Sequence, residues 1–326
     1  MKLITIQEGE ANQRLDKLLA RYLKEAPKSF LYKMLRKKNI TLNGKKADGS
    51  EKVQFGDEIR IFLSDETYDK FAGKTMEQET RYPTTRLSII YEDTHILLVN
   101  KPAGMLTQKA EPSDISLNEY VLGYLQETGQ WKESSSGGLR PSVCNRLDRN
   151  TTGIVVCGKT LAGLQQMSEV LRDRTMHKYY QCLVVGQMRD AQRIEGYLWK
   201  NPASNTVTVS SEEQPDAQRI ITEYRPIRMF NDCTLLEVCL ITGRSHQIRA
   251  HLASIGHPII GDYKYGMRNV NDRYRKRYGL TGQLLHSCRL ELPRMKAPME
   301  NLSGRTFTAE LPNIMKRILD DSEQET

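Results

Sequence analysis

Apolar and polar positions follow two different periods within the first 65 residues. After Arg14 the apolar side chains recur at helical spacing, in a stripe made by Leu15, Leu18, Leu19, Tyr22 and Leu23. Ser29 can cap a second helix, whose apolar face is made by Leu31, Met34 and Leu35. Residues 40–45 then alternate like a strand that ends in an Asn-Gly turn, and two further short apolar runs follow. The pattern predicts a small α/β domain over residues 1–64.

Beyond this domain the apolar period lapses and then returns. Residues 65–85 have no apolar period and end near Pro83, which predicts a linker. A short helix is expected over residues 117–125, and the β-branched run at residues 154–157 predicts a strand. Residues 317–326 are acidic, so we expect a disordered tail.

Composition narrows the class of protein. Hydrophobic residues make up 38% and charged residues 27% of the 326, which is polar but typical of a globular chain. There is no apolar run of about 18 residues and no h-region near the start, so neither a membrane span nor a cleaved signal is expected. None of the six cysteines forms a C-x-x-C pair, and His246 and His251 are five apart. We therefore expect free thiols in a reducing cytoplasm, no metal and no cofactor.

The positive charge is concentrated near the start of the chain. Residues 1–75 contain 16 Lys and Arg against 11 Asp and Glu, a net charge of +5 out of +8 for the chain. On the second predicted helix, Lys33, Arg36 and Lys37 point away from the apolar face. This face is either simply solvated or a surface for phosphates, whose binding would weaken with salt.

Four short motifs in residues 12–63 resemble the S4-like RNA-binding domain. They are Arg14-Leu-Asp-Lys, a basic helix opened by Ser29, the strand from Ile40 to Asn43-Gly44, and Gly56-Asp57. In that family the basic helix and the strand turn contact RNA backbone. The resemblance therefore implies RNA contacts for the following residues: Arg14, Lys33, Arg36, Lys37, Asn43 and Lys45.

Two motifs compete for the segment from Asn145 to Thr160. Gly153, Gly158, Lys159 and Thr160 match the phosphate-binding P-loop pattern G-x-x-x-x-G-K-[ST]. A P-loop needs a strand before its first glycine, whereas here polar residues precede Gly153 and the strand-like run follows it. The alternative places the chemistry earlier, at Asp148, a carboxylate kept ionised by Arg146 and Arg149 nearby. For an isolated Arg-Leu-Asp, a structural ion pair would be the simpler interpretation.

The surrounding blocks favour the chemical interpretation. The run Asn145-Arg-Leu-Asp-Arg-Asn-Thr-Thr-Gly resembles the catalytic motif of RluA-type pseudouridine synthases, usually His-Arg-Leu-Asp-x-x-Thr-Ser-Gly. Four further blocks agree in order, and they begin at Val99, Lys178, Thr242 and Leu285. The match spans about residues 88–312, so we expect a catalytic domain over residues 86–316. The fold class implied for the whole chain is α+β, with a mixed, largely antiparallel sheet after the small N-terminal domain.

The resemblance also implies an activity and a set of site residues. The enzyme would isomerise uridine in structured RNA to pseudouridine: the N1–C1′ bond breaks, the uracil turns, and C5 rejoins C1′. Asp148 would be the catalytic carboxylate; attack on the sugar, attack on the base and removal of the C2′ proton stay open. Tyr180 would stack on the flipped base, and Arg146 would fill the space that the base vacates. Arg249, expected on a helix between Ser245 and Gly256, would pair with the aspartate.

Several points are left open by these motifs. Asn145 and Thr152 replace the usual histidine and serine, and His246, His251 and His257 are interpreted as structural hydrogen-bonding groups. Residues 266–279 are basic and interleaved with tyrosines, typical of either a single-stranded RNA contact or a solvated loop. We expect the protein to be a monomer. Its expected partner is ribosomal RNA of the large subunit, with transfer RNA as a second possibility and no membrane. The alternative function is a non-catalytic RNA-binding or ribosome-assembly factor that keeps the fold, and a P-loop NTPase comes third.

Overall fold

The computed structural model describes residues 1–6, 10–72, 80–133, 139–201, 206–213 and 215–324. By internal contacts the chain divides into two compact units. The first comprises Met1–Thr85, Tyr120–Ser142 and Lys159–Ala162, and the second comprises Arg86–Glu119, Val143–Gly158 and Gly163–Thr326.

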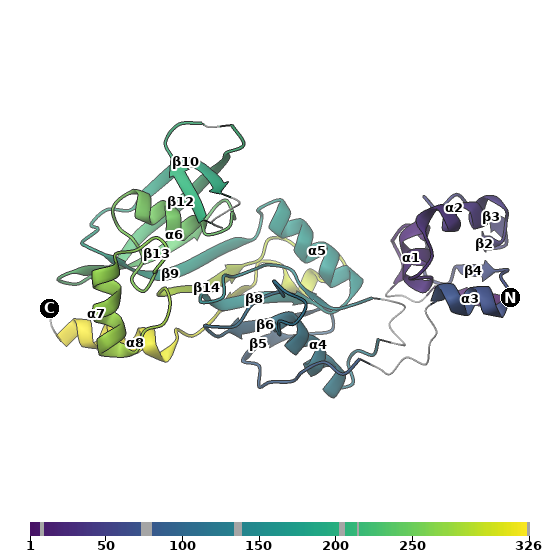
Figure 1. The fold of residues 1–326 in the computed structure, drawn as a ribbon, viewed down its shortest axis with the longest axis horizontal. Helices are drawn as coiled ribbons and strands as arrows, with labels where there is room; N and C mark the ends of the chain where they lie inside the picture. The colour runs from purple at the N-terminus through teal and green to yellow at the C-terminus, as the bar shows by residue number, and fades with distance from the viewer. Residues whose placement is uncertain (7–9, 73–79, 134–138, 202–205, 214, 325–326) are drawn as a thin grey trace. The chain divides into compact units, whose positions relative to one another are not determined.

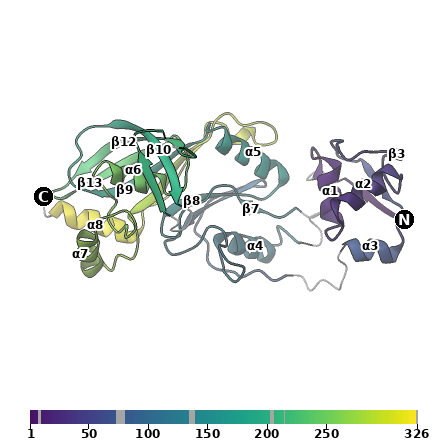
Figure 2. The same ribbon diagram turned by 45° about the horizontal axis from the view of Figure 1, so that its top comes forward.

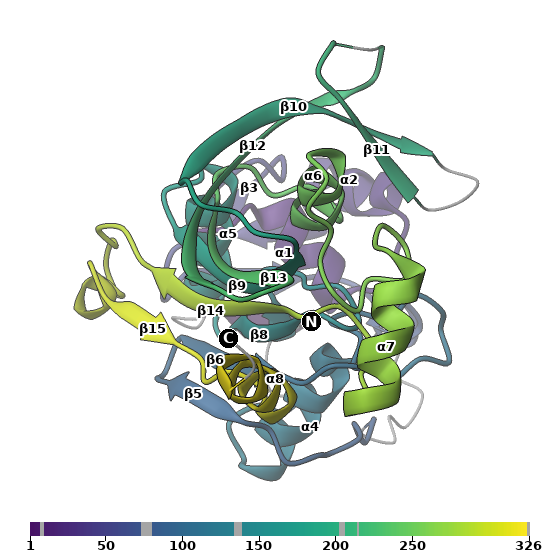
Figure 3. The same ribbon diagram turned by 90° about the vertical axis from the view of Figure 1, so that its left-hand side faces the viewer.

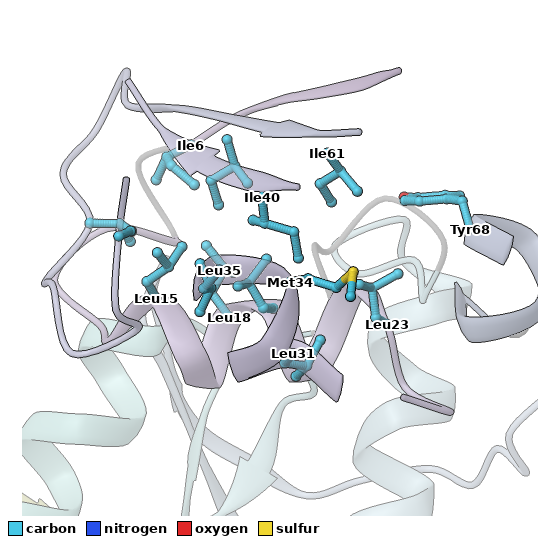
Figure 4. Packing of buried hydrophobic residues seen from close by; sticks show 14 residues of the cluster. Ile6, Leu15, Leu18, Leu23, Leu31, Met34, Leu35, Ile40, Ile61 and Tyr68 are labelled. Carbon is cyan, nitrogen blue, oxygen red and sulfur yellow. The ribbon is translucent and has the colours of Figure 1, made fainter. Parts of the chain in front are cut away.

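The first unit begins with a small antiparallel sheet packed on two helices (Figure 1). The sheet has the order β1-β4-β2-β3, with β1 at Lys2–Thr5, β2 at Ile40–Leu42, β3 at Lys45–Lys46 and β4 at Glu58–Ile61. Helices α1 (Leu15–Tyr22) and α2 (Lys28–Arg36) follow the two apolar stripes read from the sequence. Those stripes meet the inner face of the sheet in one core, which Figure 4 shows around Leu18, Leu35 and Ile40.

Two details of this unit differ from the sequence-based expectation. Helix α2 starts at Lys28 rather than after Ser29, because the carbonyl of Pro27 accepts the N–H of Phe30 at 2.9 Å and so closes the first turn earlier. The first part of the expected linker 65–85 is a helix, α3 (Asp65–Ala72), whose Tyr68 is buried in the same core. Its apolar stripe consists of only two aromatic side chains, too few for the helical period to be recognised among the charged neighbours.

The second unit is built on an 11-stranded mixed sheet, so the α+β fold class expected from sequence is confirmed. The main path runs β11-β10-β12-β13-β9-β14-β8-β6-β5, with β15 beside β14 and β7 beside β8. The bounds are β5 Ile89–Glu92, β6 Ile96–Lys101, β7 Ser142–Val143, β8 Thr152–Gly158, β9 His177–Val185, β10 Gln192–Asn201, β11 Thr206–Ser210, β12 Gln218–Met229, β13 Cys233–Leu240, β14 Leu285–Glu291 and β15 Thr306–Thr308. Strands β14 and β8 pair in parallel, and the other pairings recorded for this sheet are antiparallel.

Strand β14 joins the two halves of the sheet and sets where the site forms. Its Ser287 is in register with Gly153 of β8 on one side and with Tyr180 of β9 on the other. A Cβ atom on Gly153 would lie 2.2 Å from the carbonyl oxygen of Ser287, and the φ of Gly153 is +107°, so only glycine fits. This glycine serves close strand pairing, and residues 154–157 form part of β8 rather than a phosphate-binding loop, which excludes the P-loop interpretation.

The helices of the larger unit pack against the curved sheet. Helix α6 (Gln247–Ser254) contacts β10, β11 and β12 on the inner side of their curve (Figure 3). Helices α7 (Arg268–Tyr278) and α8 (Asn313–Gln324) lie next to each other near β9 and β13 (Figure 2). Most of α5 (Leu161–Arg172) and the short 3₁₀ helix Glu300–Leu302 also belong to this unit. Helix α4 (Leu117–Glu127) belongs mostly to the first unit and confirms the helix expected over residues 117–125.

Two further expectations are wrong. The basic segment 266–279 is not a loop: it forms α7, and Tyr274 is buried against Met315, so that ring is not available to stack on a base. The tail expected to be disordered over residues 317–326 is instead helical as far as Gln324, and its Ile318 is buried in that core. Residues 325–326 lie outside the described part of the chain.

Three features that composition made unexpected are a membrane-spanning helix, a metal site and a disulfide. Across the residues that the structure describes, no helix is both long and apolar enough to cross a membrane. Within the same residues, no group of three or more His, Cys, Asp and Glu side chains could hold a metal ion. All six cysteines are free thiols.

Candidate active site

Asp148 lies in the turn that leads from β7 into β8. The N–H of Thr151 donates to the backbone carbonyl of Asp148 at 3.1 Å and closes the turn. The hydroxyl of Thr107 donates to the carbonyl of Leu147 at 2.7 Å and accepts the N–H of the same residue at 3.1 Å. The backbone is thus fixed on both sides of Asp148, while its side chain stays 28% exposed.

Arg249 connects Asp148 to a second, buried carboxylate. Its Nη1 donates to Oδ2 of Asp148 at 2.7 Å. Its Nε and Nη2 donate to Oδ2 and Oδ1 of Asp262 at 2.7 and 3.0 Å, a two-point contact that fixes the plane of the guanidinium. Burial by itself lowers the pKa of Arg249, but the hydrogen bonds and negative charges of Asp262 and Asp148 more than offset this and raise the pKa above its ordinary value. Arg249 therefore stays charged.

Sequence reasoning did not assign a role to Asp262. Its side chain is 1% exposed, and the residue is held by α7, because Asn271 donates from Nδ2 to its carbonyl at 2.8 Å. The same Asn271 accepts the N–H of Gly261 at 2.7 Å. The sequence offered one signal: the dipeptide Gly261-Asp262 ends the matching block that begins at Thr242, and the same block contains Arg249. A buried carboxylate needs a cationic partner such as this arginine.

Tyr180 reaches the site from the middle of β9. Its side chain is buried, with 6% of the residue exposed, and the ring lines the same cleft as Asp148. Burial raises the pKa of Tyr180, so its hydroxyl keeps its proton. The backbone of Tyr180 is paired with β13 on one side and β14 on the other, so the ring enters the cleft from the middle of the sheet.

Lys101, at the end of β6, supports the Asp148 turn from below the surface. The residue is fully buried, and its ammonium donates to the carbonyls of Pro102, Met105 and Arg149 at 3.0, 2.8 and 3.0 Å. Burial lowers the pKa of Lys101 to about 8, although the charge of Asp148 acts in the opposite direction. Lys101 was part of a matching block, but its role as a clamp between two loops follows only from the structure.

Replacing Lys101 by methionine should lower the free energy of unfolding by about 2–4 kcal/mol at pH 7, because three carbonyls lose their donor. The lysine is charged up to about pH 10.5 in the unfolded chain but only up to about pH 8 when folded, so the unfolded state binds more protons between these values. The stability advantage of the wild type over Lys101→Met should therefore grow as the pH rises through that window. Urea unfolding of both proteins measures it, and a difference that shrinks with pH would contradict the argument.

The two departures from the family motif have structural explanations. Asn145 donates to the carbonyl of Ile154 at 3.2 Å and accepts the N–H of Val156 at 2.8 Å, so its side chain pairs with β8. The hydroxyl of Thr152 lies 2.7 Å from Nδ1 of His286. Neither side chain forms a hydrogen bond with Asp148, whose carboxylate is instead paired with Arg249.

An open cleft of about 1000 Å³ surrounds these residues. Asp148, Tyr180, Arg249 and Arg146 all line it, so the structure brings together the four residues that the resemblance placed at the site. Arg146 is exposed and forms no ion pair with any described residue. Further cations also line the cleft: Lys109, Arg149, Arg172, Arg174, Lys178, Arg244 and Lys264.

The predicted RNA-binding residues of the first unit fall into two groups. Lys33 and Arg36 lie on the outer face of α2, Lys37 follows directly at its C-terminal end, and Lys45 lies on β3; all four are exposed. Arg14, in contrast, forms two hydrogen bonds of 3.0 Å with the carboxylate of Asp16. Asn43 is occupied within its own turn, where Nδ2 donates to Asp57 at 2.8 Å and Oδ1 accepts the N–H of Glu58 at 2.8 Å. The lysines and Arg36 are thus better placed for phosphates than these two side chains.

One carboxylate paired with an arginine, in a polar cleft with cationic walls, is typical of an enzyme that acts on a phosphate-bearing polymer. Residues 95–254 match the family described as RNA pseudouridylate synthase, and residues 13–59 match the S4 domain. The chain belongs to the RNA pseudouridylate synthase family, and an S4 domain precedes its catalytic part.

The relatives agree over nearly the whole chain. Ribosomal large subunit pseudouridine synthase C of Vibrio cholerae is 30% identical over 300 residues, covering 89% of this chain and 88% of the relative. The proteins of the same name from Haemophilus influenzae and Escherichia coli strain K12 are 32% and 31% identical, covering 98% and 92% of this chain and 94% and 93% of the relatives.

Solved structures show the same fold. Human RNA pseudouridylate synthase domain containing 4 superimposes with a TM-score of 0.57 at 22% identity, covering 72% of this chain and 93% of that one. Human RNA pseudouridylate synthase domain containing 1 gives a TM-score of 0.51 at 19% identity, covering 76% of this chain and 98% of that one.

Proposed function

We propose that this protein isomerises uridine to pseudouridine in ribosomal RNA of the large subunit, with Asp148 as the catalytic carboxylate. The observation that carries this proposal is the pair of Asp148 and Arg249 at the floor of a cationic cleft, 2.7 Å apart. The pairing holds the carboxylate of Asp148 in a fixed orientation. The substrate class is supported by the names of the relatives and by the S4 domain.

The target base must leave its stack to reach Asp148, which costs a few kcal/mol. Tyr180 offers a rigid ring on which the flipped uracil can stack, and Arg146 is free to enter the space that the base vacates. The cations that line the cleft can hold the neighbouring phosphates. The chain's own residues thus bind, extract and orient the nucleotide, while one carboxylate acts at the reacting atoms.

The direct test is a map of pseudouridines in RNA from cells with and without the gene, combined with the purified protein acting on the same RNA without added cofactor. Loss of a site in large-subunit ribosomal RNA, restored by the pure protein, would support the proposal. A loss confined to transfer RNA would overturn the substrate class. If no pseudouridine were lost, the protein would instead be a non-catalytic RNA-binding or assembly factor.

The S4 domain, which we propose acts as an RNA anchor, yields a separate prediction. Changing Lys33, Arg36 and Lys37 to alanine should weaken RNA binding. It should also reduce the slope of the logarithm of the binding constant against the logarithm of salt concentration, by up to about 0.7–0.9 for each of the three residues. The rate of conversion on bound RNA should stay within about twofold of wild type, since RNA held in the cleft meets the same groups. Filter binding at several salt concentrations and single-turnover assays measure the two quantities.

A matched control removes three arginines that already have acidic partners. Arg193, Arg219 and Arg225 form ion pairs with glutamates on the larger sheet, so their replacement changes the net charge equally. We expect a smaller change of slope in this control. Equal losses in the two triple variants would show that net charge alone, rather than the α2 face, determines binding.

A further inference from the structure

His246 stands beside Asp148 in an unusual backbone conformation. It immediately precedes α6, with φ of 55° and ψ of 15°, in the left-handed region that side chains rarely adopt. Its imidazole lines the cleft, and Nε2 lies 3.9 Å from Oδ1 of Asp148. Left-handed backbone at a residue other than glycine costs roughly 1 kcal/mol, and such strain is concentrated at functional sites.

The hydroxyl of Tyr265 contacts the imidazole of His246 on its Nδ1 side. The N–H of Val207, on β11, donates to the phenolic oxygen of Tyr265 at 3.0 Å. The same oxygen lies 2.8 Å from Nδ1 of His246. With its oxygen accepting from Val207, Tyr265 can donate its proton to Nδ1, and in this arrangement a neutral imidazole carries its hydrogen on Nε2.

The charge state of His246 agrees with this tautomer. Burial lowers the pKa of His246, and the positive charges of Arg249 and Lys264 act in the same direction. Asp148 and Asp262 oppose the shift without reversing it. The imidazole is therefore neutral and serves as an N–H donor.

The gap between His246 and Asp148 is suited to a substrate atom. Arg249 occupies Oδ2 of the aspartate, and no described residue donates a hydrogen bond to Oδ1. A separation of 3.9 Å is too long for a hydrogen bond between Nε2–H and Oδ1 themselves. Both groups can instead reach neighbouring atoms of a nucleotide at the cleft floor.

The chemistry of the isomerisation calls for a donor at this point. When N1–C1′ breaks, the bonding pair passes to the base, and its charge spreads over N1, O2 and O4. A half-turn of uracil about its N3–C6 axis puts C5 in the place of N1 and O4 in the place of O2. The C5–C1′ bond then forms, C5 loses its proton and N1 gains one, so the composition is unchanged. One fixed donor beside C1′ therefore meets O2 before the turn and O4 after it.

We propose that the Nε2–H of His246 donates a hydrogen bond to the uracil carbonyl beside the reacting bond, O2 in uridine and O4 after the turn. This inference rests on the proposed function. It makes His246 a catalytic residue that stabilises the detached, negatively charged base without giving up its proton, as oxyanion-binding donors do.

The test combines a change in the protein with a change in the substrate. His246→Phe removes the donor, whereas His246→Gln retains an N–H at a similar reach. On an RNA fragment that the wild type modifies, His246→Phe should convert uridine about 10²–10³-fold more slowly, and His246→Gln should lose less, about tenfold. Affinity for the RNA should stay within about twofold in both, since one neutral group adds little to binding. His177→Phe, an exposed histidine that does not line the cleft, is the matched control and should behave as wild type.

Replacing the target uridine by 2-thiouridine weakens the acceptor at position 2. The ratio of uridine to 2-thiouridine rates should be larger for the wild type than for His246→Phe, because the variant has no donor to lose. Equal ratios, or a His246→Phe rate equal to wild type, would overturn the assignment. If His246→Phe does not fold, Tyr265→Phe replaces it. Without the phenol, the imidazole proton of His246 is no longer held on Nε2 and can move to Nδ1, so the ratio of uridine to 2-thiouridine rates should again fall. Absence of any conversion by the wild type would refute the proposed function itself.

Discussion

Asp148→Asn should abolish conversion of uridine to pseudouridine, with a loss of at least about 10⁴-fold in single-turnover rate. Asparagine has nearly the same shape and can still accept the hydrogen bond from Nη1 of Arg249, which is 2.7 Å away in the wild type. It has no charge, however, and can neither attack carbon nor accept a proton at neutral pH. Arg249 keeps its two-point contact with Asp262, so the fold and the affinity for RNA should change little.

The measurement uses excess enzyme on a defined RNA fragment, with pseudouridine detected by a chemical adduct that stops primer extension. Asp272→Asn, on the exposed side of α7, is the charge-matched control and should convert RNA at the wild-type rate. Conversion by Asp148→Asn at the wild-type rate would refute the catalytic assignment. A loss of RNA binding together with activity would show that the aspartate is structural instead.

Arg249→Met should have the second-largest effect, and on two quantities. It leaves Asp262 buried without a partner, so the free energy of unfolding should fall by about 3–5 kcal/mol. It also releases Asp148 from its orientation, and the conversion rate should fall by about two orders of magnitude or more. Arg249→Lys keeps the charge but cannot reach both carboxylates with a fixed planar fork, so it should be intermediate in both.

A second substitution separates the two effects. In the double variant Arg249→Met with Asp262→Asn, the uncompensated buried charge is removed, and much of the lost stability should return. Activity should not return, because nothing then holds Asp148. Recovery of both stability and activity would show that Arg249 acts only by neutralising Asp262, and urea unfolding with single-turnover assays distinguishes these results.

Local periodicity predicted the elements whose apolar stripes are wide. Helices α1 and α4 and strand β8 were expected because many apolar side chains recur at one period within a short window. Helix α3 was missed because its apolar stripe is narrow and lies among charged residues. The apolar stripe of α8 is four residues wide, but the acidic residues that end the chain hid it; Tyr68 and Ile318 are core residues because a partner surface covers them. The tyrosines of α7 show the same limit, since a buried and an exposed ring look alike in sequence.

Ordered motifs identified the reaction and the residues proposed to perform it. Asp148, Tyr180 and Arg249 stand in matching blocks, and the kind of chemistry follows from their types and order. The partner class followed from the basic excess near the start of the chain and from the S4-like pattern.

Tertiary structure decided how these groups act on one another. Asp148 and Arg249 are 101 residues apart in sequence and 2.7 Å apart in space, and no local pattern predicts such a distance. The buried partner Asp262, the Lys101 clamp and the Tyr265 hydroxyl that sets the proton on His246 depend on three-dimensional contacts between separate elements. Hydrogen bonds and charge interactions act over a few ångströms of space. The sequence by itself therefore determined which chemical groups the protein has, and the fold decided their charge, tautomer and orientation.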